Sequence, residues 1–403
     1  MSESTPALTN PPKTSWGLLG TPVFVIVAFV VVACGDARSP PGVGHQVSID
    51  KQVWLGGLEG RATAIARMPG GGFVIAGHLS TGWAVATDAQ GTILWKYEAP
   101  LDEKLTLRSP AFSHSEFHGV VPLANGNVLL CGEEHTTVDK VVALITVLSS
   151  TGDVVEERQE FTNGDDEYAS SSVARCVQWD DGVALSGTKR DRASPNTLTW
   201  VMRLDSNGAK QWQEISSSDA PLFNPVATSD HGLLVSRLDT RTTETTLIKF
   251  NAKGEIEVGS APIKAGSLYL MRPIEPASGL AVVGHSGLSN TYQLLTLGER
   301  LEKSEEPREL KSFSLQEGFG FRRPDQSLVL FGSVSTQSGG RGAVEWVAKN
   351  GEVLAGAVFP QILESLTFGD AVPLSSNEFV VVACQNAYAS RTHGLFMSWI
   401  TLK

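Results

Sequence analysis

The chain has 403 residues and is 41% hydrophobic, with 40 Gly, 20 Pro and four Cys. This composition excludes a disordered chain, a collagen-like chain and a small disulfide-stapled domain, and the length suits several domains or one large repeat array. The 32 Lys and Arg residues against 43 Asp and Glu give a formal net charge of −11. Because phosphate neutralisation needs a basic surface, we expect no nucleic acid partner.

The N-terminal region contains an uncharged apolar segment, residues 23–33, that stops at Cys34. At about 1.5 Å per residue this segment is too short to cross a hydrocarbon core of about 30 Å. Residues 1–33 are therefore predicted to be a secretory signal peptide. The last residues before and including Cys34, Val-Val-Ala-Cys, resemble the bacterial lipobox, in which the Cys becomes the lipidated first residue of the mature protein.

This resemblance implies lipid attachment at Cys34 and a lipid-attached linker over residues 34–46. An uncleaved N-terminal anchor with an ordinary apolar Cys34 is the alternative. In lipoproteins of bacteria with two membranes, Asp after the lipidated Cys resembles an inner-membrane retention signal. Because Gly35 occupies that position, we expect a protein of the bacterial cell envelope held by its lipid anchor, with the outer membrane favoured over the inner membrane.

The remainder of the chain contains an internal repeat, with a strand, a Gly-rich turn and a second strand recurring about every 50 residues. The second strand ends at one anchor position in each of seven units: Gly77, Gly132, Gly187, Arg237, Gly284, Gly332 and Ala383. A second hairpin with a D-x-x-G or similar turn follows in most units. Two hairpins give four antiparallel strands per unit, which is typical of a β-propeller.

The seventh unit lacks its fourth strand, because the chain ends at Lys403 where the third strand should finish. Residues 47–55 form an unpaired β-rich segment before the first unit. We therefore predict an all-β fold over residues 47–403, a seven-bladed propeller of four-stranded antiparallel blades closed by the N-terminal strand. Closure would remove an open sheet edge.

The units resemble the quinoprotein-like propeller repeat, whose A-x-D-x-x-G-x-x-x-W pattern is matched by Ala86, Asp88, Gly91 and Trp95, and in part by Asp205, Gly208 and Trp212. In that family the Trp docks one blade on the next, and we expect this of Trp95 and Trp212. Trp54 is predicted to be set in the same way, whereas Glu156 replaces the Trp in unit two. Propellers of this kind include quinone-dependent dehydrogenases, an outer-membrane assembly lipoprotein and sugar-processing enzymes.

The candidate catalytic and metal-binding motifs do not lie in the local structure that their chemistry requires. His114 and His118 lie four residues apart, with Glu116 between them, which is the spacing of a zinc-binding pair. Residues with this spacing converge on one metal only on a helix, so we interpret both histidines as ordinary loop residues. The acidic residues 163–167 are interpreted as a solvated loop rather than a Ca²⁺ site. His78, Glu133 and His285 each directly follow an anchor position, so we expect them on one face of the propeller. We interpret them as surface polar residues. We therefore expect no catalytic residues, no metal and no cofactor.

The cysteines other than Cys34 are Cys131, Cys176 and Cys384. Alignment on the repeat places Cys131 and Cys176 on inner strands of the adjacent second and third blades. A disulfide between these two residues and a pair of small buried thiols remain the alternatives.

A binding surface is predicted from the direction of the strands. The short turns within the hairpins share one face, so the opposite face carries the longer loops, where function concentrates on rigid scaffolds. Basic side chains gather there, and the candidate binding face comprises Lys189, Arg190, Arg192, Arg391 and His393.

The sequence thus predicts a non-catalytic, membrane-anchored lipoprotein whose propeller is a binding or scaffolding surface for another envelope or extracellular protein or a ligand. The alternative is a propeller enzyme of the quinoprotein dehydrogenase or sugar-active type. The two classes differ at the central channel. Three or more carboxylates or histidines converging at one channel mouth would favour the enzyme.

Overall fold

The computed structural model describes residues 45–403 apart from short gaps, so the predicted signal peptide, Cys34 and most of the linker lie outside the described residues. The gaps are residues 57–59, 80, 101–114, 138–139, 162–167, 192–196, 217–221, 229, 240–241, 243, 264–266, 275–279, 287–290, 299, 304–305, 311–315, 337–338, 360–364 and 388–391. His114 and the acidic residues 163–167 fall in these gaps. Within the described residues, no helix has the length and apolar character of a membrane span.

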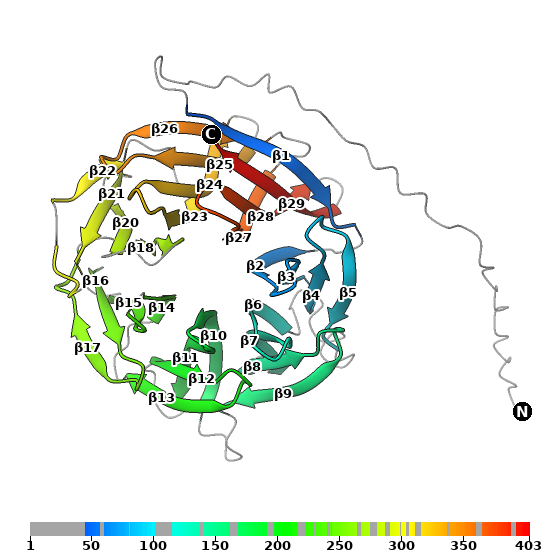
Figure 1. Ribbon diagram of the computed structural model, residues 1–403. Coiled ribbons are helices and arrows are strands. Elements are labelled where there is room, and N and C mark those ends of the chain that lie inside the picture. The colour runs from blue at the N-terminus through cyan, green and yellow to red at the C-terminus, as the bar shows by residue number, and fades with distance from the viewer. Residues whose placement is uncertain are drawn as a thin grey trace, which may run out of the picture. The chain divides into compact units, whose positions relative to one another are not determined.

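Seven antiparallel sheets form a ring around a central channel, which confirms the predicted all-β, seven-bladed propeller (Figure 1). Blade 1 comprises β2 (Arg61–Arg67), β3 (Phe73–His78), β4 (Gly82–Thr87) and β5 (Ile93–Glu98). Blade 2 comprises β6 (Ser115–Pro122), β7 (Val128–Thr137), β8 (Lys140–Leu148) and β9 (Val154–Glu160). Blade 3 comprises β10 (Tyr168–Trp179), β11 (Gly182–Asp191), β12 (Thr197–Leu204) and β13 (Lys210–Ser216).

The later blades follow the same order, with the first strand innermost. Blade 4 comprises β14 (Leu222–Ala227), β15 (Leu233–Asp239), β16 (Glu244–Phe250) and β17 (Ile256–Gly259). Blade 5 comprises β18 (Ser267–Leu270), β20 (Leu280–Ser286), β21 (Thr291–Leu297) and β22 (Arg308–Leu310). Blade 6 comprises β23 (Gln316–Arg322), β24 (Leu328–Thr336), β25 (Gly339–Val347) and β26 (Val353–Val358), with β19 (Arg272–Pro273) paired in parallel to β23.

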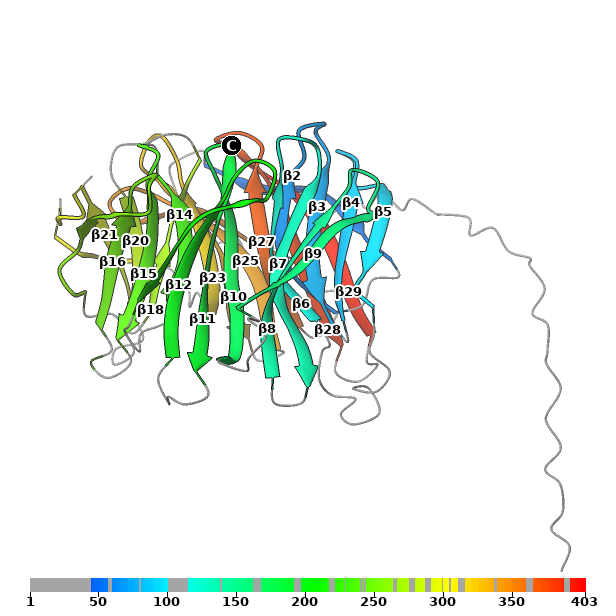
Figure 2. The same ribbon diagram turned by 90° about the horizontal axis from the view of Figure 1, so that it is seen from below.

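Blade 7 combines both ends of the propeller, as the sequence predicts. Its strands are β27 (Ser365–Pro373), β28 (Glu378–Ala387), β29 (Thr392–Leu402) and, outermost, β1 (Val47–Trp54). Strand β1 runs antiparallel to β29, from the pair Val47 and Leu402 to the pair Trp54 and Phe396. The N-terminal strand therefore closes the ring (Figures 1 and 2).

Two tryptophans dock neighbouring blades as expected. The indole N–H of Trp95 donates to the carbonyl oxygen of Ser150 in a turn of blade 2, at 2.9 Å. Trp212 donates to the carbonyl oxygen of Ala252 in the corresponding turn of blade 4, at 3.2 Å. In blade 2, which has Glu156 at the Trp position, Arg158 instead donates to the carbonyl oxygen of Gly208 in blade 3.

The predicted position of Trp54 is wrong. Lys51 pairs with Trp399 in the register that Trp95 holds against Ala86 in blade 1, and Trp54 lies three residues further along β1. The Lys51 ammonium lies 4.6 Å from the ring centre of Trp399 and donates to the carbonyl oxygen of Gln90 in blade 1. Trp54 lies against Phe396 and is 51% exposed, so Lys51 supplies the contact to the next blade.

The hydrophobic core lies between blades. In one cluster, Leu129 and Ile145 of blade 2 pack with Leu185 and Met202 of blade 3. Because each sheet is covered on both faces by its neighbours, its middle strands, such as β3 and β4, are buried along most of their length, whereas an outermost strand such as β5 alternates between more and less exposed positions.

Candidate functional site

The innermost strands of several blades carry a β-bulge near the same end of the channel. The pairing register shifts between Ala62 and Ala64 in β2 and between Phe117 and Gly119 in β6. It also shifts between Val173 and Arg175 in β10. A bulge adds one unpaired residue and re-aims its side chain, and bulges are common beside functional sites. The added residues are Thr63, His118 and Ala174.

The anchor glycines of the repeat explain these bulges. A Cβ atom at Gly77 would overlap the carbonyl oxygen of Arg61, which comes just before the bulge in β2. A Cβ atom at Gly132 would likewise overlap the carbonyl oxygen of Glu116, and one at Gly187 that of Ser172. At these three positions a side chain would collide with the displaced inner strand, so these anchor glycines are coupled to the channel-lining residues.

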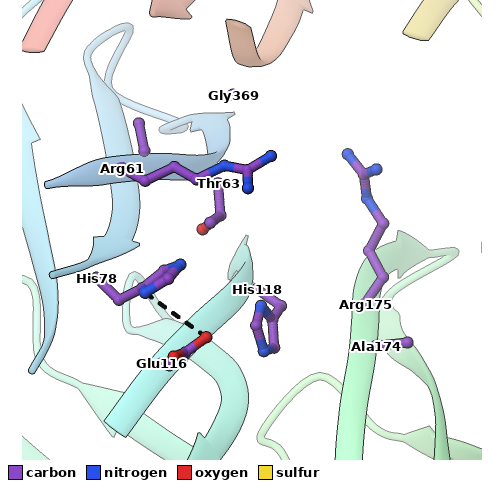
Figure 3. Close-up of a pocket in the computed structure, with 9 residues that line it drawn as sticks. Arg61, Thr63, His78, Glu116, His118, Ala174, Arg175 and Gly369 are labelled. Atoms are coloured by element: carbon purple, nitrogen blue, oxygen red, sulfur yellow. Dashed lines mark ion pairs between the residues drawn. The ribbon is translucent and has the colours of Figure 1, made fainter. Parts of the chain in front are cut away.

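The bulged residues line one cavity of about 350 Å³ on the channel wall (Figure 3). Its lining comes from the inner parts of blades 7, 1, 2 and 3: Arg61, Ala62, Thr63, His78, Glu116, His118, Ala174, Arg175 and Gly369. Arg61 begins β2 and His78 ends β3, so the cavity lies at the end of the channel opposite the short hairpin turns. This is the face on which the sequence predicts binding.

One half of the cavity is basic. Arg61 and Arg175 extend towards it from opposite sides (Figure 3). Arg175 is held by the buried carboxylate of Asp370 at 3.2 Å, and Arg272 pairs with the other oxygen of Asp370 at 2.5 Å. The backbone N–H of Ala371 also donates to Asp370. Asp370 therefore ties three parts of the ring together and orients Arg175.

The other side gathers imidazoles and carboxylates. His78 Nδ1 lies 3.5 Å from Glu116 Oε2, as drawn in Figure 3. His118 Nε2 lies 3.9 Å from one oxygen of Glu133, and His135 Nε2 lies 3.8 Å from the other. These five side chains are between 18% and 25% exposed, so solvent reaches them only in part.

Burial lowers the pKa of His78 below its ordinary value of 6.5, and the nearby His118 and Arg61 act in the same direction, against Glu116 and Glu133. His78 is therefore predominantly neutral at pH 7, with one ring nitrogen able to accept a proton or a hydrogen bond. Glu116, His118 and Glu133 each offer one ligand atom, and these atoms lie within 4.8 Å of one another. This trio has the donor types that bind divalent metals.

A disulfide lies directly behind this trio. Cys131 of β7 and Cys176 of β10 are joined, with their Cα atoms 6.3 Å apart. A Cβ atom at Gly119 would lie 2.6 Å from Cys176 Sγ and 2.7 Å from Cys131 Sγ, so the bond passes over a glycine. Because Gly119 follows His118, the disulfide fixes the backbone beside that imidazole. Cys384 is a buried free thiol.

The structure describes the side chains of only two residues of the candidate binding face. Lys189 belongs to strand β11 rather than to a loop and is only 3% exposed, with its ammonium 5.0 Å from the ring centre of Phe161. Arg190 is exposed on the same strand. Arg192, Arg391 and the side chain of His393 lie outside the described residues. A role of these residues in binding stays a prediction.

The interpretation of His78, Glu116, His118 and Glu133 as separate surface or loop residues does not describe their arrangement. The spacing of residues along one helix does not apply to this fold, because the side chains converge from two blades and not from one element. His78 and Glu133 each directly follow an anchor glycine, and His118 is the bulged residue opposite one. A bulge inferred from these glycines would have indicated the cluster. The side chain of His285 lies outside the described residues.

No family model and no curated protein matches the chain. Its fold is similar to that of the Dos1 propeller, with a TM-score of 0.54 and 9% identity over 88% of this chain and 95% of that one. It is also similar to a catalytically inactive virginiamycin B lyase from Staphylococcus aureus, solved with quinupristin. The TM-score is 0.53 and the identity 11%, over 89% of this chain and 100% of that one. For a protein of unknown function from Dyadobacter fermentans the TM-score is 0.50 and the identity 12%, over 89% of this chain and 99% of that one. These similarities show the propeller fold and no more.

Proposed function

We propose that the protein is an exported lipoprotein, anchored through Cys34 in the bacterial cell envelope with the outer membrane favoured, and that its propeller binds a small anionic ligand in the channel cavity. The lipobox-like segment supports the anchor. The observation that carries the binding function is the pair of guanidinium groups, Arg61 and Arg175, extending into one cavity from opposite sides.

The chemistry of the cavity indicates the class of ligand. A guanidinium has five N–H donors, so Arg175 can hold Asp370 and a bound oxyanion together. The same cavity is lined by Thr63, His78 and Glu116, which are hydrogen-bonding groups suited to hydroxyls. The volume falls within the usual range of small-molecule sites. A molecule with a carboxylate or phosphate group and several hydroxyls, such as an acidic sugar, fits these features.

A titration of the mature protein with glucuronate, inorganic phosphate and glucose tests this proposal. We expect glucuronate or phosphate to bind and neutral glucose to bind far more weakly. Arg175→Gln should weaken the binding of the anion at least tenfold, because it removes a charge-assisted contact of about 1.5–3 kcal/mol. Lys253→Gln, on the exposed short-turn face, is the matched control. Binding that is equal for glucose, or that Arg175→Gln leaves unchanged, would refute the proposal.

A second candidate function is a sugar-active enzyme, the alternative that the sequence leaves open. It is favoured by the convergence of His78, Glu116, His118, Glu133 and His135, since catalysis needs acid and base groups gathered at one channel mouth. Its neutral His78 beside Glu116 is suited to proton transfer. Incubation with acidic polysaccharides distinguishes the two functions: product formation that His78→Ala abolishes supports the enzyme, and binding without turnover supports the binding protein.

A further inference from the structure

The strongest unexplained feature is the Glu116, His118 and Glu133 trio, which lies against the cavity but extends beyond it. Two of its members, Glu116 and Glu133, are carboxylates from adjacent strands β6 and β7. Two carboxylates held this close repel each other in their ionised forms. The imidazole of His118 is the third group, with its Nε2 3.9 Å from Glu133 Oε2.

We infer that Glu116, His118 and Glu133 bind one divalent transition-metal ion, with Zn²⁺ as the ion that best fits one imidazole and two carboxylates. Zinc bonds of about 2.0–2.2 Å hold ligand atoms of a tetrahedral site roughly 3.3 Å apart. His118 Nε2 and Glu133 Oε2 are already 3.9 Å apart, so about half an ångström of adjustment brings them to this separation.

Neighbouring side chains support the two carboxylates in the way that outer groups support metal ligands. His78 lies 3.5 Å from Glu116, and His135 lies 3.8 Å from the far oxygen of Glu133. Ligating carboxylates in metal sites usually have such polar neighbours. Each of the two carboxylates therefore has an imidazole beside it that is not one of the three ligands.

The backbone that carries the trio is also fixed. His118 is the bulged residue of β6, and Gly119 after it lies beneath the disulfide of Cys131 and Cys176. Glu133 follows Cys131 by two residues on β7. A site built on paired strands and held by a covalent link is more precise than one built on loops.

The metal would have three protein ligands and an open position. Structural zinc sites close all four positions with protein groups, whereas sites that act on a ligand keep one open. Glu116 and His118 line the cavity, so the open position faces the space into which Arg61 and Arg175 extend. A bound oxyanion would then bridge the metal and the guanidinium groups. This last step rests on the proposed function, whereas the metal site itself does not.

A calorimetric titration of the chelator-stripped mature protein with Zn²⁺ tests the inference. We expect one ion per chain, no comparable binding of Mg²⁺ or Ca²⁺, and a loss of affinity of at least about 100-fold in His118→Ala and in Glu133→Gln. His231→Ala is the matched control, because His231 makes a similar contact with a carboxylate of Asp180 in the turns of the opposite face. Circular dichroism and a melting curve for each variant exclude misfolding.

Failure to bind one equivalent of zinc would overturn the metal site. Binding that His118→Ala and Glu133→Gln leave intact, or that His231→Ala removes, would do the same. The glucuronate titration is repeated on the chelated and the zinc-loaded protein. Glucuronate binding to a protein that fails to take up zinc would overturn the metal site and leave the proposed function intact. Zinc binding without glucuronate binding would support the metal site and reject the proposed ligand.

Discussion

The disulfide between Cys131 and Cys176 allows a quantitative prediction for the stability of the propeller. Its cysteines are separated by 45 positions and connect blade 2 to blade 3. In the chain-entropy model, a closed loop of this length stabilises the folded state by about 4 kcal/mol. We therefore expect the double variant Cys131→Ala, Cys176→Ala to lose about 4 kcal/mol of unfolding free energy, because its unfolded chain regains the entropy that the link removes.

The assay is urea-induced unfolding of a mature Cys34→Ser protein and of the same protein carrying the double substitution, each with and without a thiol reductant. Reductant should lower the unfolding free energy of the parent to about that of the double variant. It should leave the unfolding free energy of the double variant unchanged. Burial raises the pKa of the remaining thiol, Cys384, to about 11, so this residue stays protonated and unreactive in the folded protein. A thiol assay on the parent, denatured without reductant, should detect one thiol, that of Cys384. Three thiols, or a parent indifferent to reductant, would refute the reasoning.

Three further predictions concern the anchor, the closure and one titrating pair. Cys34→Ser should release the protein from the membrane fraction or leave it as precursor, and unchanged processing and fractionation would contradict lipid attachment. Deletion of residues 45–54 should lower the melting temperature and promote aggregation, because it exposes the edge of β29; a melting temperature equal to that of the parent would reject the closure. The hydrogen bond that His231 donates to the carboxylate of Asp180 raises the pKa of His231, so this pair stabilises the fold at pH values below about 6.5, and its contribution is lost as the pH rises through the raised pKa. An NMR titration should show the pKa of His231 returning to its ordinary value in Asp180→Asn, and no change would contradict the pairing.

The periodic parts of the fold were predictable because each has a local physical cause. Glycines at fixed turn positions and the spacing of anchors such as Gly77 and Gly132 predict hairpins and blades without knowledge of long-range contacts. The closing strand followed from counting strands. The position of Trp54 did not, because β1 pairs with β29 in a register that sets Lys51, three residues before Trp54, at the docking position. A pattern of residue types does not reveal the register between two strands that are distant in sequence.

The candidate site was harder to predict because it depends on contacts between blades. Arg175 is oriented by Asp370, which is distant in sequence and belongs to the last blade. His118 and Glu133 meet because a bulge in one strand lies opposite a glycine in the next. Spacing rules for helices and single loops do not describe that geometry. The anchor glycines carried the signal, since a position that accepts only glycine indicates a close approach of backbone.

We infer that the bulged inner strands build a metal site at one end of the channel. The most direct test is an anomalous difference map, recorded at the zinc absorption edge, from crystals of the mature protein soaked in Zn²⁺. We predict one strong peak within about 2.2 Å of His118 Nε2 and of a carboxylate oxygen of Glu116 and Glu133. A channel without a peak, or a peak only beside His231 on the opposite face, would contradict the metal site.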